Sequence, residues 1–159
     1  METISMDTLT HEDTLTASSL YEMDFYQWAF HNAVLLRQGR LTEIDLENIA
    51  EELESMGRSD KREIANRLAV LIMHLLKWQY QPKRRCESWR TTIGNQVIAI
   101  KHLLEDSPSL NHNIDTVVAK EFITAKRMFE KETGISAKAL PETCLYTFEQ
   151  LMDYDFWSE

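Results

Sequence analysis

The sequence contains little of the material that turns and cross-links require. It has four glycines and three prolines in 159 residues. This disfavours an all-β fold, because such folds need many tight turns. The two cysteines, Cys86 and Cys144, are too few for a disulfide framework, and neither belongs to a CxxC metal pair. Free thiols fit a reducing compartment, so we expect a cytoplasmic protein.

The sequence also shows no pattern typical of a targeting signal or of a membrane-spanning segment. The N-terminal stretch METISMDTLTHEDTLTASS has neither a basic start nor an apolar run, so it does not read as a secretory signal. The densest apolar run, LAVLIMHLLKW, is interrupted by His74 and is shorter than the ~20 residues that a membrane span needs. We therefore expect no membrane partner.

Catalytic signatures are absent as well. The chain has no GxSxG nucleophile motif, no glycine-rich phosphate loop and no HxxxH or ExxH metal pair. These absences favour a protein that is not an enzyme and that holds no cofactor.

What the sequence does contain is typical of a soluble globular protein. Apolar residues make up 43% and charged residues 27% of the chain. The length favours one domain. Residues 1–18 are rich in threonine and acid, which predicts a disordered tail. The remainder, 19–159, is expected to form one helical bundle domain.

Apolar residues recur at helical spacing along most of this domain. The pattern predicts six helices, over roughly 24–38, 45–56, 59–80, 88–106, 111–133 and 147–153. No period-2 strand pattern is convincing, so the predicted fold class is all-α, a bundle of five to six helices. The expected caps and stops are Asp24, Gly39, Asp45, Gly57, Ser59, Pro82, Pro108, Gly134 and the Thr147–Gln150 capping box.

Charge is distributed unevenly along the chain. Residues 1–60 carry 3 basic and 13 acidic groups, whereas residues 61–104 carry 9 basic and 2 acidic groups. The basic middle could pack against the acidic flanks, or it could form a face for an anionic partner. The net charge of −9 disfavours nucleic acid as that partner.

The most unusual stretch is LLKWQYQPKRRCESWR, and we call its residues 77–90 the basic corner. Stacking rings mixed with cations are typical of single-stranded nucleic-acid binding. The alternative is a structural corner between two helices, with its tryptophans in the core and its arginines paired to acids. The candidate ligand or partner residues are Trp78, Tyr80, Lys83, Arg84, Arg85 and Arg90.

A metal site is a further alternative. His74 and two glutamates of the second predicted helix, Glu51 and Glu52, could meet in a bundle core and serve a metal-dependent hydrolase. The competing interpretation is a boundary histidine that pairs with a neighbouring helix, beside glutamates on a solvated face.

Several longer stretches resemble a known bacterial family. They are DLENIAEELESMGRS, HLLKWQYQP, ESWRTTI, EDSPSL, ETGI and PETCLYTFEQLMD, within about 21–156. Their order and spacing are similar to those of the family catalogued as domain of unknown function twenty-nine. The resemblance implies a mostly α-helical domain, common in cyanobacteria and other bacteria, without an established activity. Two departures are Cys86, where serine is expected, and Leu145, where proline is usual.

The working hypothesis from the sequence is a non-catalytic protein-interaction module. It would act through a protein partner or through self-association. Nucleic-acid association through the basic corner and metal-dependent hydrolysis remain the two alternatives.

Overall fold

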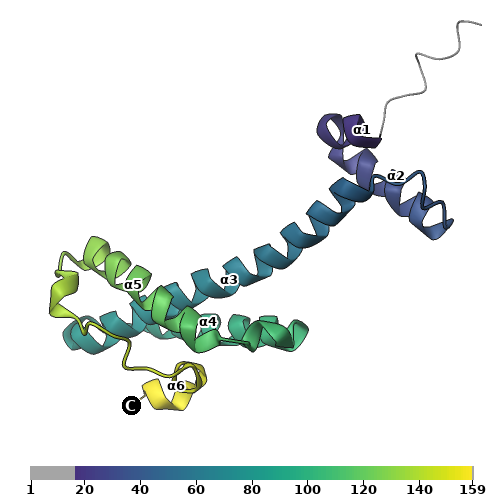
Figure 1. Cartoon of the computed structure of the whole chain (residues 1–159). Helices are drawn as coiled ribbons and strands as arrows, with labels where there is room; N and C mark the ends of the chain where they lie inside the picture. The colour runs from purple at the N-terminus through teal and green to yellow at the C-terminus, as the bar shows by residue number, and fades with distance from the viewer. Residues whose placement is uncertain (1–16, 159) are drawn as a thin grey trace, which may run out of the picture. The chain divides into compact units, whose positions relative to one another are not determined.

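The structure is a computed structural model and describes residues 17–158. Helices are the only regular secondary structure in this part of the chain, which confirms the all-α prediction. Four long helices carry the fold, and short ones precede, connect or follow them (Figure 1). In chain order the elements are α1 (Ala17–Met23), α2 (Phe25–Arg37), α3 (Leu46–Tyr80), η1 (Pro82–Arg84), α4 (Glu87–Asp106), η2 (Pro108–Asn111), α5 (Ile114–Thr133), η3 (Ala137–Ala139), α6 (Phe148–Met152) and α7 (Tyr154–Ser158).

The chain divides into two compact units, Met1–Gly57 and Arg58–Glu159, which we call the first and the second unit. The boundary falls within α3. Of the predicted disordered tail, residues 1–16 lie outside the described part, while residues 17 and 18 begin α1. The sequence pattern did not indicate α1. The assignment of 19–159 to a single domain stays a prediction.

α3 is one helix of 35 residues where two were predicted. Gly57 was expected to end the first and Ser59 to cap the second, but both lie inside the continuous helix. A glycine in a helix interior costs only about 1 kcal/mol relative to alanine, and no proline follows to enforce a break. Like the other described helices, α3 is not apolar enough over its length to cross a membrane.

The second unit has a conventional helical core. The later part of α3 packs against α4 and α5, and the loop residue Leu140 and Leu151 of α6 complete the cluster. Its largest fully buried side chains are Leu68, Leu71, Ile72, Leu75, Leu76, Ile100, Phe122, Phe129 and Leu151. This explains why the apolar stripes of these helices were readable from the sequence: each faces the same core.

Several predicted helix ends are confirmed. The Asp24 carboxylate accepts a hydrogen bond from the backbone N–H of Gln27 at 2.9 Å and caps α2. Gly39 and Gly134 follow α2 and α5 in left-handed conformations, with φ of 70° and 74°. The Thr147–Gln150 capping box is formed in both directions at the start of α6.

Candidate interaction surface

Within the first unit, a network of hydrogen bonds at Asp45 joins α2 to the beginning of α3. The indole Nε1–H of Trp28 donates to the Asp45 carboxylate at 3.0 Å. The Asn32 amide donates to the Trp28 carbonyl at 2.9 Å and accepts the backbone N–H of Asp45 at 2.8 Å. Trp28 and Asn32 are both buried, so these bonds satisfy groups that water cannot reach.

Asp45 has an electrostatic role in addition to its geometric one. Burial tends to raise the pKa of its carboxyl, but hydrogen bonds from Asn48 and Trp28 outweigh burial and hold that pKa below its usual range. The Asn48 side chain donates to Asp45 at 2.8 Å, and its backbone N–H donates at 3.4 Å, which confirms Asp45 as the cap of α3. Nearby, the hydroxyl of Tyr21 donates to Glu52, and this bond to a carboxylate raises the pKa of the phenol.

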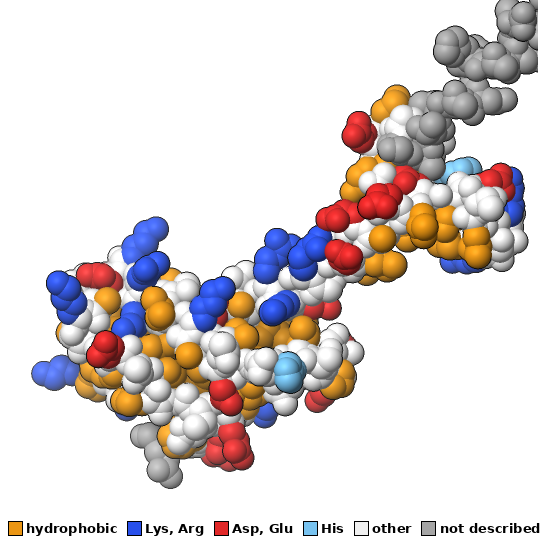
Figure 2. Space-filling model, in the orientation of Figure 1, with side chains coloured by type: hydrophobic (Ala, Val, Ile, Leu, Met, Phe, Trp, Pro, Cys, Tyr) orange, Lys and Arg blue, Asp and Glu red, His pale blue; other side chains and the backbone are white. Residues whose placement is uncertain are grey.

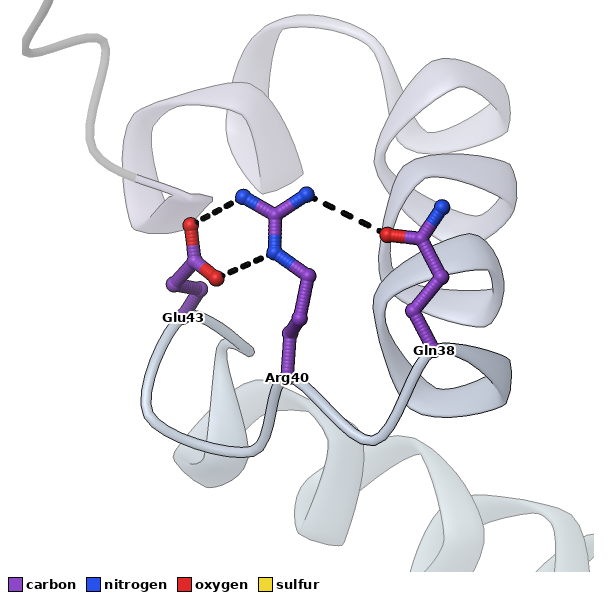
Figure 3. A network of polar contacts seen from close by, with 3 residues as sticks. All are labelled: Gln38, Arg40 and Glu43. Atoms are coloured by element: carbon purple, nitrogen blue, oxygen red, sulfur yellow. Dashed lines mark hydrogen bonds and ion pairs between the residues drawn. The ribbon is translucent and has the colours of Figure 1, made fainter.

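The loop that follows α2 contains an ion pair between Arg40 and Glu43 (Figure 3). The Arg40 guanidinium pairs with both carboxylate oxygens of Glu43, and its third nitrogen donates to the Gln38 side chain at 3.2 Å. The hydrogen bond from Arg40 lowers the pKa of Glu43. The contact fixes the turn through which α2 returns to Asp45, although both side chains are about half exposed.

The side of α2 opposite Trp28 and Asn32, which bond to Asp45, is exposed and apolar. Tyr26, Phe30 and Val34 follow one another at four-residue spacing, which keeps them on one side of the helix. Their exposed fractions are 73%, 58% and 47%. The rings of Tyr26 and Phe30 lie next to each other, with centroids 4.6 Å apart. We call these three residues the outer α2 face.

The first unit exposes further large apolar side chains on α1, on α2, in the loop that follows and at the beginning of α3. They are Met23, Phe25, Leu36, Leu41, Leu46, Leu53 and Met56. Figure 2 shows hydrophobic side chains gathered over α2 and the beginning of α3. The smaller unit thus carries ten of the 16 exposed large hydrophobic residues that the structure describes. Concentrated exposure of this kind is typical of interaction surfaces.

The exposed apolar surface of the first unit was not predicted from the sequence. α2 reads FYQWAFHNAVLLR and is apolar on more than one side. A helix with that pattern is normally buried all round. Here only Trp28, Asn32 and Leu35 are buried. The absence of charged residues between Asp24 and Arg37 was the available signal, since a solvated helix face usually carries charge.

The basic corner lies in the second unit, at the end of α3, in η1 and at the beginning of α4. Trp78 is partly buried and packs against the core. The guanidinium carbons of Arg85 and Arg90 lie 4.8 and 5.6 Å from the centroid of its ring. Arg85 also donates from Nε to the Trp78 carbonyl at 2.8 Å. The ring of Tyr80 meets Phe129 edge-on at 6.4 Å.

Three cations of the corner, Lys83, Arg84 and Arg85, are not neutralised by a carboxylate of the described chain. Among residues 17–158, no carboxylate lies within ion-pair distance of Lys83, Arg84 or Arg85. All three are exposed. Arg90 lies 3.9 Å from Glu87 of its own helix, at the limit of an ion pair. The corner therefore combines structural stacking with exposed positive charge.

The C-terminal segment is fastened to the end of α3 by Tyr146. Its hydroxyl donates to the Gln79 side chain, and its ring meets Trp157 edge-on at 4.6 Å. Burial, with smaller effects from Tyr80 and Cys144, raises the pKa of Tyr146 to about 12. Burial also raises the pKa of the Cys144 thiol, so the thiol stays protonated at neutral pH.

His74 is half-buried on α3, and its ring is engaged locally. Nδ1 lies 2.9 Å from the Val70 carbonyl; because a carbonyl only accepts, Nδ1 carries the proton and donates. Burial lowers the pKa of His74, and nearby Lys77 lowers it further.

Of the two other metal candidates, Glu52 accepts a hydrogen bond from Tyr21, and Glu51 is exposed. Within the described chain no three His, Cys, Asp or Glu side chains are grouped so as to hold a metal ion.

The family model described as "Domain of unknown function DUF29" matches residues 20–157, and the chain belongs to that family. This confirms the resemblance noted in the sequence. Comparisons with curated proteins and with solved structures found no match. The description of the family names no activity.

Proposed function

We propose that this family member is a non-catalytic protein-interaction module whose binding surface is the apolar surface of the first unit. One observation carries the proposal: within its described part, 17–57, the first unit buries three side chains but leaves ten large hydrophobic side chains exposed. Water contact with that much apolar surface is unfavourable, by roughly 25 cal/mol per Å² that a partner would cover. Covering it is therefore a source of binding free energy.

Chemical cross-linking in the cells that carry the gene tests this proposal. The variant replaces Tyr26, Phe30 and Leu53 by serine, and its control replaces Ile98, Ile123 and Leu145 of the second unit, which are comparably exposed. The wild type and the control should give the same adducts, and the first-unit variant should lose them. Circular dichroism shows whether both variants keep their helix content. Identical adducts from all three proteins, or none from the wild type, would refute the proposal.

Nucleic-acid association is the second candidate, and one observation favours it. Lys83 and Arg84 are exposed, and neither forms an ion pair with a described carboxylate. Such cations suit phosphate contacts. Against it, Arg85 and Arg90 stack on Trp78, so this ring is less available to a base. The net charge of −9 further opposes approach to a polyanion.

Binding of labelled single-stranded and duplex DNA at low salt tests this second candidate. Replacing Arg84 and Arg85 by glutamate should abolish salt-sensitive binding while the fold persists. Replacing Lys120 and Lys131, two exposed lysines of α5, by glutamate is the charge-matched control. Absence of binding by the wild type, or equal loss in both variants, would eliminate the basic corner as a nucleic-acid site.

A further inference from the structure

We propose that the outer α2 face pairs with the same face of a second copy of the chain, with the two α2 helices antiparallel. The inference rests on the proposed function, because it names the partner of the first-unit surface. The occupant is a second copy rather than an unrelated protein, and three features of the first unit support that choice.

The first feature is the apolar pattern of α2. A two-fold axis beside Phe30 would place that ring against Phe30 of the second copy, and Tyr26 against the second copy's Val34. The spacing of the three residues is symmetric about Phe30, four positions to either side. A two-fold interface needs this self-complementarity, because the same patch must serve on both sides.

The second feature is the distribution of charge. From Phe25 to Leu36, α2 carries no Lys, Arg, Asp or Glu. The first unit is acidic as a whole, yet its outer α2 face offers no carboxylate to a basic partner helix. The stretch of α2 from Phe25 to Leu36 therefore sets no like charges against each other when two copies pair along it.

Charges of opposite sign lie at the two ends of the helix. Arg37 is in the last turn of α2, and Glu22 and Asp24 lie beside its beginning. Antiparallel pairing brings each Arg37 toward the acidic end of the other copy, whereas parallel pairing would align like charges. Arg37 forms no ion pair with any residue from 17 to 158. Antiparallel helix dipoles favour the same orientation.

The third feature is the small core of the first unit. Within its described part, 17–57, only Trp28, Asn32 and Leu35 are buried. A unit of this size with so few buried side chains among its described residues usually needs a disulfide, a metal or oligomerisation to be stable. Both cysteines lie in the second unit, so a disulfide within the first is not available. Dimerisation would supply the missing apolar contacts.

Light scattering coupled to size-exclusion chromatography, over a series of protein concentrations, tests the inference on the full chain. The wild type should have the mass of a dimer. Phe30→Glu, which sets two carboxylates against each other at the axis, should weaken the dimer by about a hundredfold or more. Tyr26→Glu is the second variant, should Phe30→Glu lose helix content. Ile98→Glu on α4, 54% exposed, is the control and should remain dimeric. A monomeric wild type, or a dimer that persists in both α2 variants, overturns the inference.

Charge reversal tests the orientation. Arg37→Glu and Glu22→Arg should each weaken the dimer by about fivefold, because each variant loses two symmetric ion pairs. The double variant should recover wild-type affinity, since the pairs are restored with reversed sign. A double variant weaker than both single variants would contradict antiparallel pairing.

Failure of this inference is distinguishable from failure of the proposed function. A monomeric wild type whose cellular cross-links still depend on Tyr26, Phe30 and Leu53 would show that the surface binds another protein. The dimer would then be wrong while the interaction module stands. A monomeric wild type without such cross-links would refute both.

Discussion

Trp28 and Asp45 join α2 to the beginning of α3 through a single hydrogen bond of 3.0 Å between the indole Nε1–H and a carboxylate oxygen. The same carboxylate caps α3 through Asn48. Asn32 closes the arrangement, because it bonds to the backbone of both residues. The residue that caps α3 therefore also fixes which side of α2 is buried, and hence which side is exposed.

Replacing Asp45 by alanine should destabilise the first unit by about 2 kcal/mol, through loss of the helix cap and of a partner for the buried indole N–H. Asp45→Asn should cost less, since asparagine is also a good cap. Hydrogen exchange of the α2 amides measures the effect directly, because it reports local opening. Equal protection in the wild type and Asp45→Ala would contradict the role assigned to this carboxylate. Glu130→Ala, at an exposed position of α5, is the control.

Most of the second-unit helices were predictable because their sequence signals and their surroundings agree. The stripes of α4 and α5 face one core, and Pro108 and Gly134 mark helix ends for steric reasons. Gly57 was misleading because glycine permits a helix end without enforcing one. Its φ is not positive, unlike that of Gly39 and Gly134, so it adopts an ordinary helical conformation.

Gly57→Ala should therefore stabilise the protein by about 1 kcal/mol. Apart from the neighbouring residues and backbone of α3 itself, no described atom lies within 4 Å of the position that the new Cβ would take, so the substitution creates no clash. Gly134→Ala has equally open space, but its φ of 74° disfavours a side chain, and we expect a loss of about 1 kcal/mol. Urea unfolding measures both changes. Destabilisation by Gly57→Ala would show that α3 is not continuous at this residue in solution.

The candidate sites differ in how much the sequence revealed. The basic corner was visible because cations and aromatics adjoin in the chain, and Lys83 and Arg84 are indeed exposed. The outer α2 face was not visible, because an apolar residue looks the same in the sequence whether it is buried or exposed. The hydrogen bonds at Asp45 mark the buried side of α2, and a contact across 17 residues has no local sequence signal.

His74 should make stability depend on pH. Burial lowers its pKa in the folded state, so the unfolded chain binds a proton more readily. The neutral ring's contribution is fully present above the unfolded pKa of about 6.5 and is lost as pH falls below it toward the folded value. We expect the free energy of unfolding to decrease as pH falls through this range.

His74→Gln should flatten that dependence, whereas His102→Gln, at an exposed position of α4, should leave it unchanged. Urea titrations at a series of pH values, with circular dichroism as the probe, measure the slope. A slope that survives in His74→Gln would assign it to another group.

Lys77 shows that the first residue of the basic corner has a structural role. Its side chain is buried, with Nζ 3.2 Å from Glu132 of α5 and 4.5 Å from the centroid of the Trp89 ring. The ammonium thus lies among α3, α4 and α5, unlike the exposed Lys83 and Arg84. The basic corner therefore contains one buried cation, Lys77, and several exposed ones.

Glu132→Ala should cost about 1 kcal/mol, because it leaves the Lys77 ammonium without its carboxylate, and the exposure of Glu132 keeps the effect modest. Lys77→Met keeps the packing volume and should be close to neutral. In the Lys77→Met background, Glu132→Ala should then cost almost nothing, since no charge remains to be paired. Urea unfolding of the two single variants and the double variant completes the cycle. An equal cost of Glu132→Ala in both backgrounds would mean that the 3.2 Å contact contributes nothing to stability.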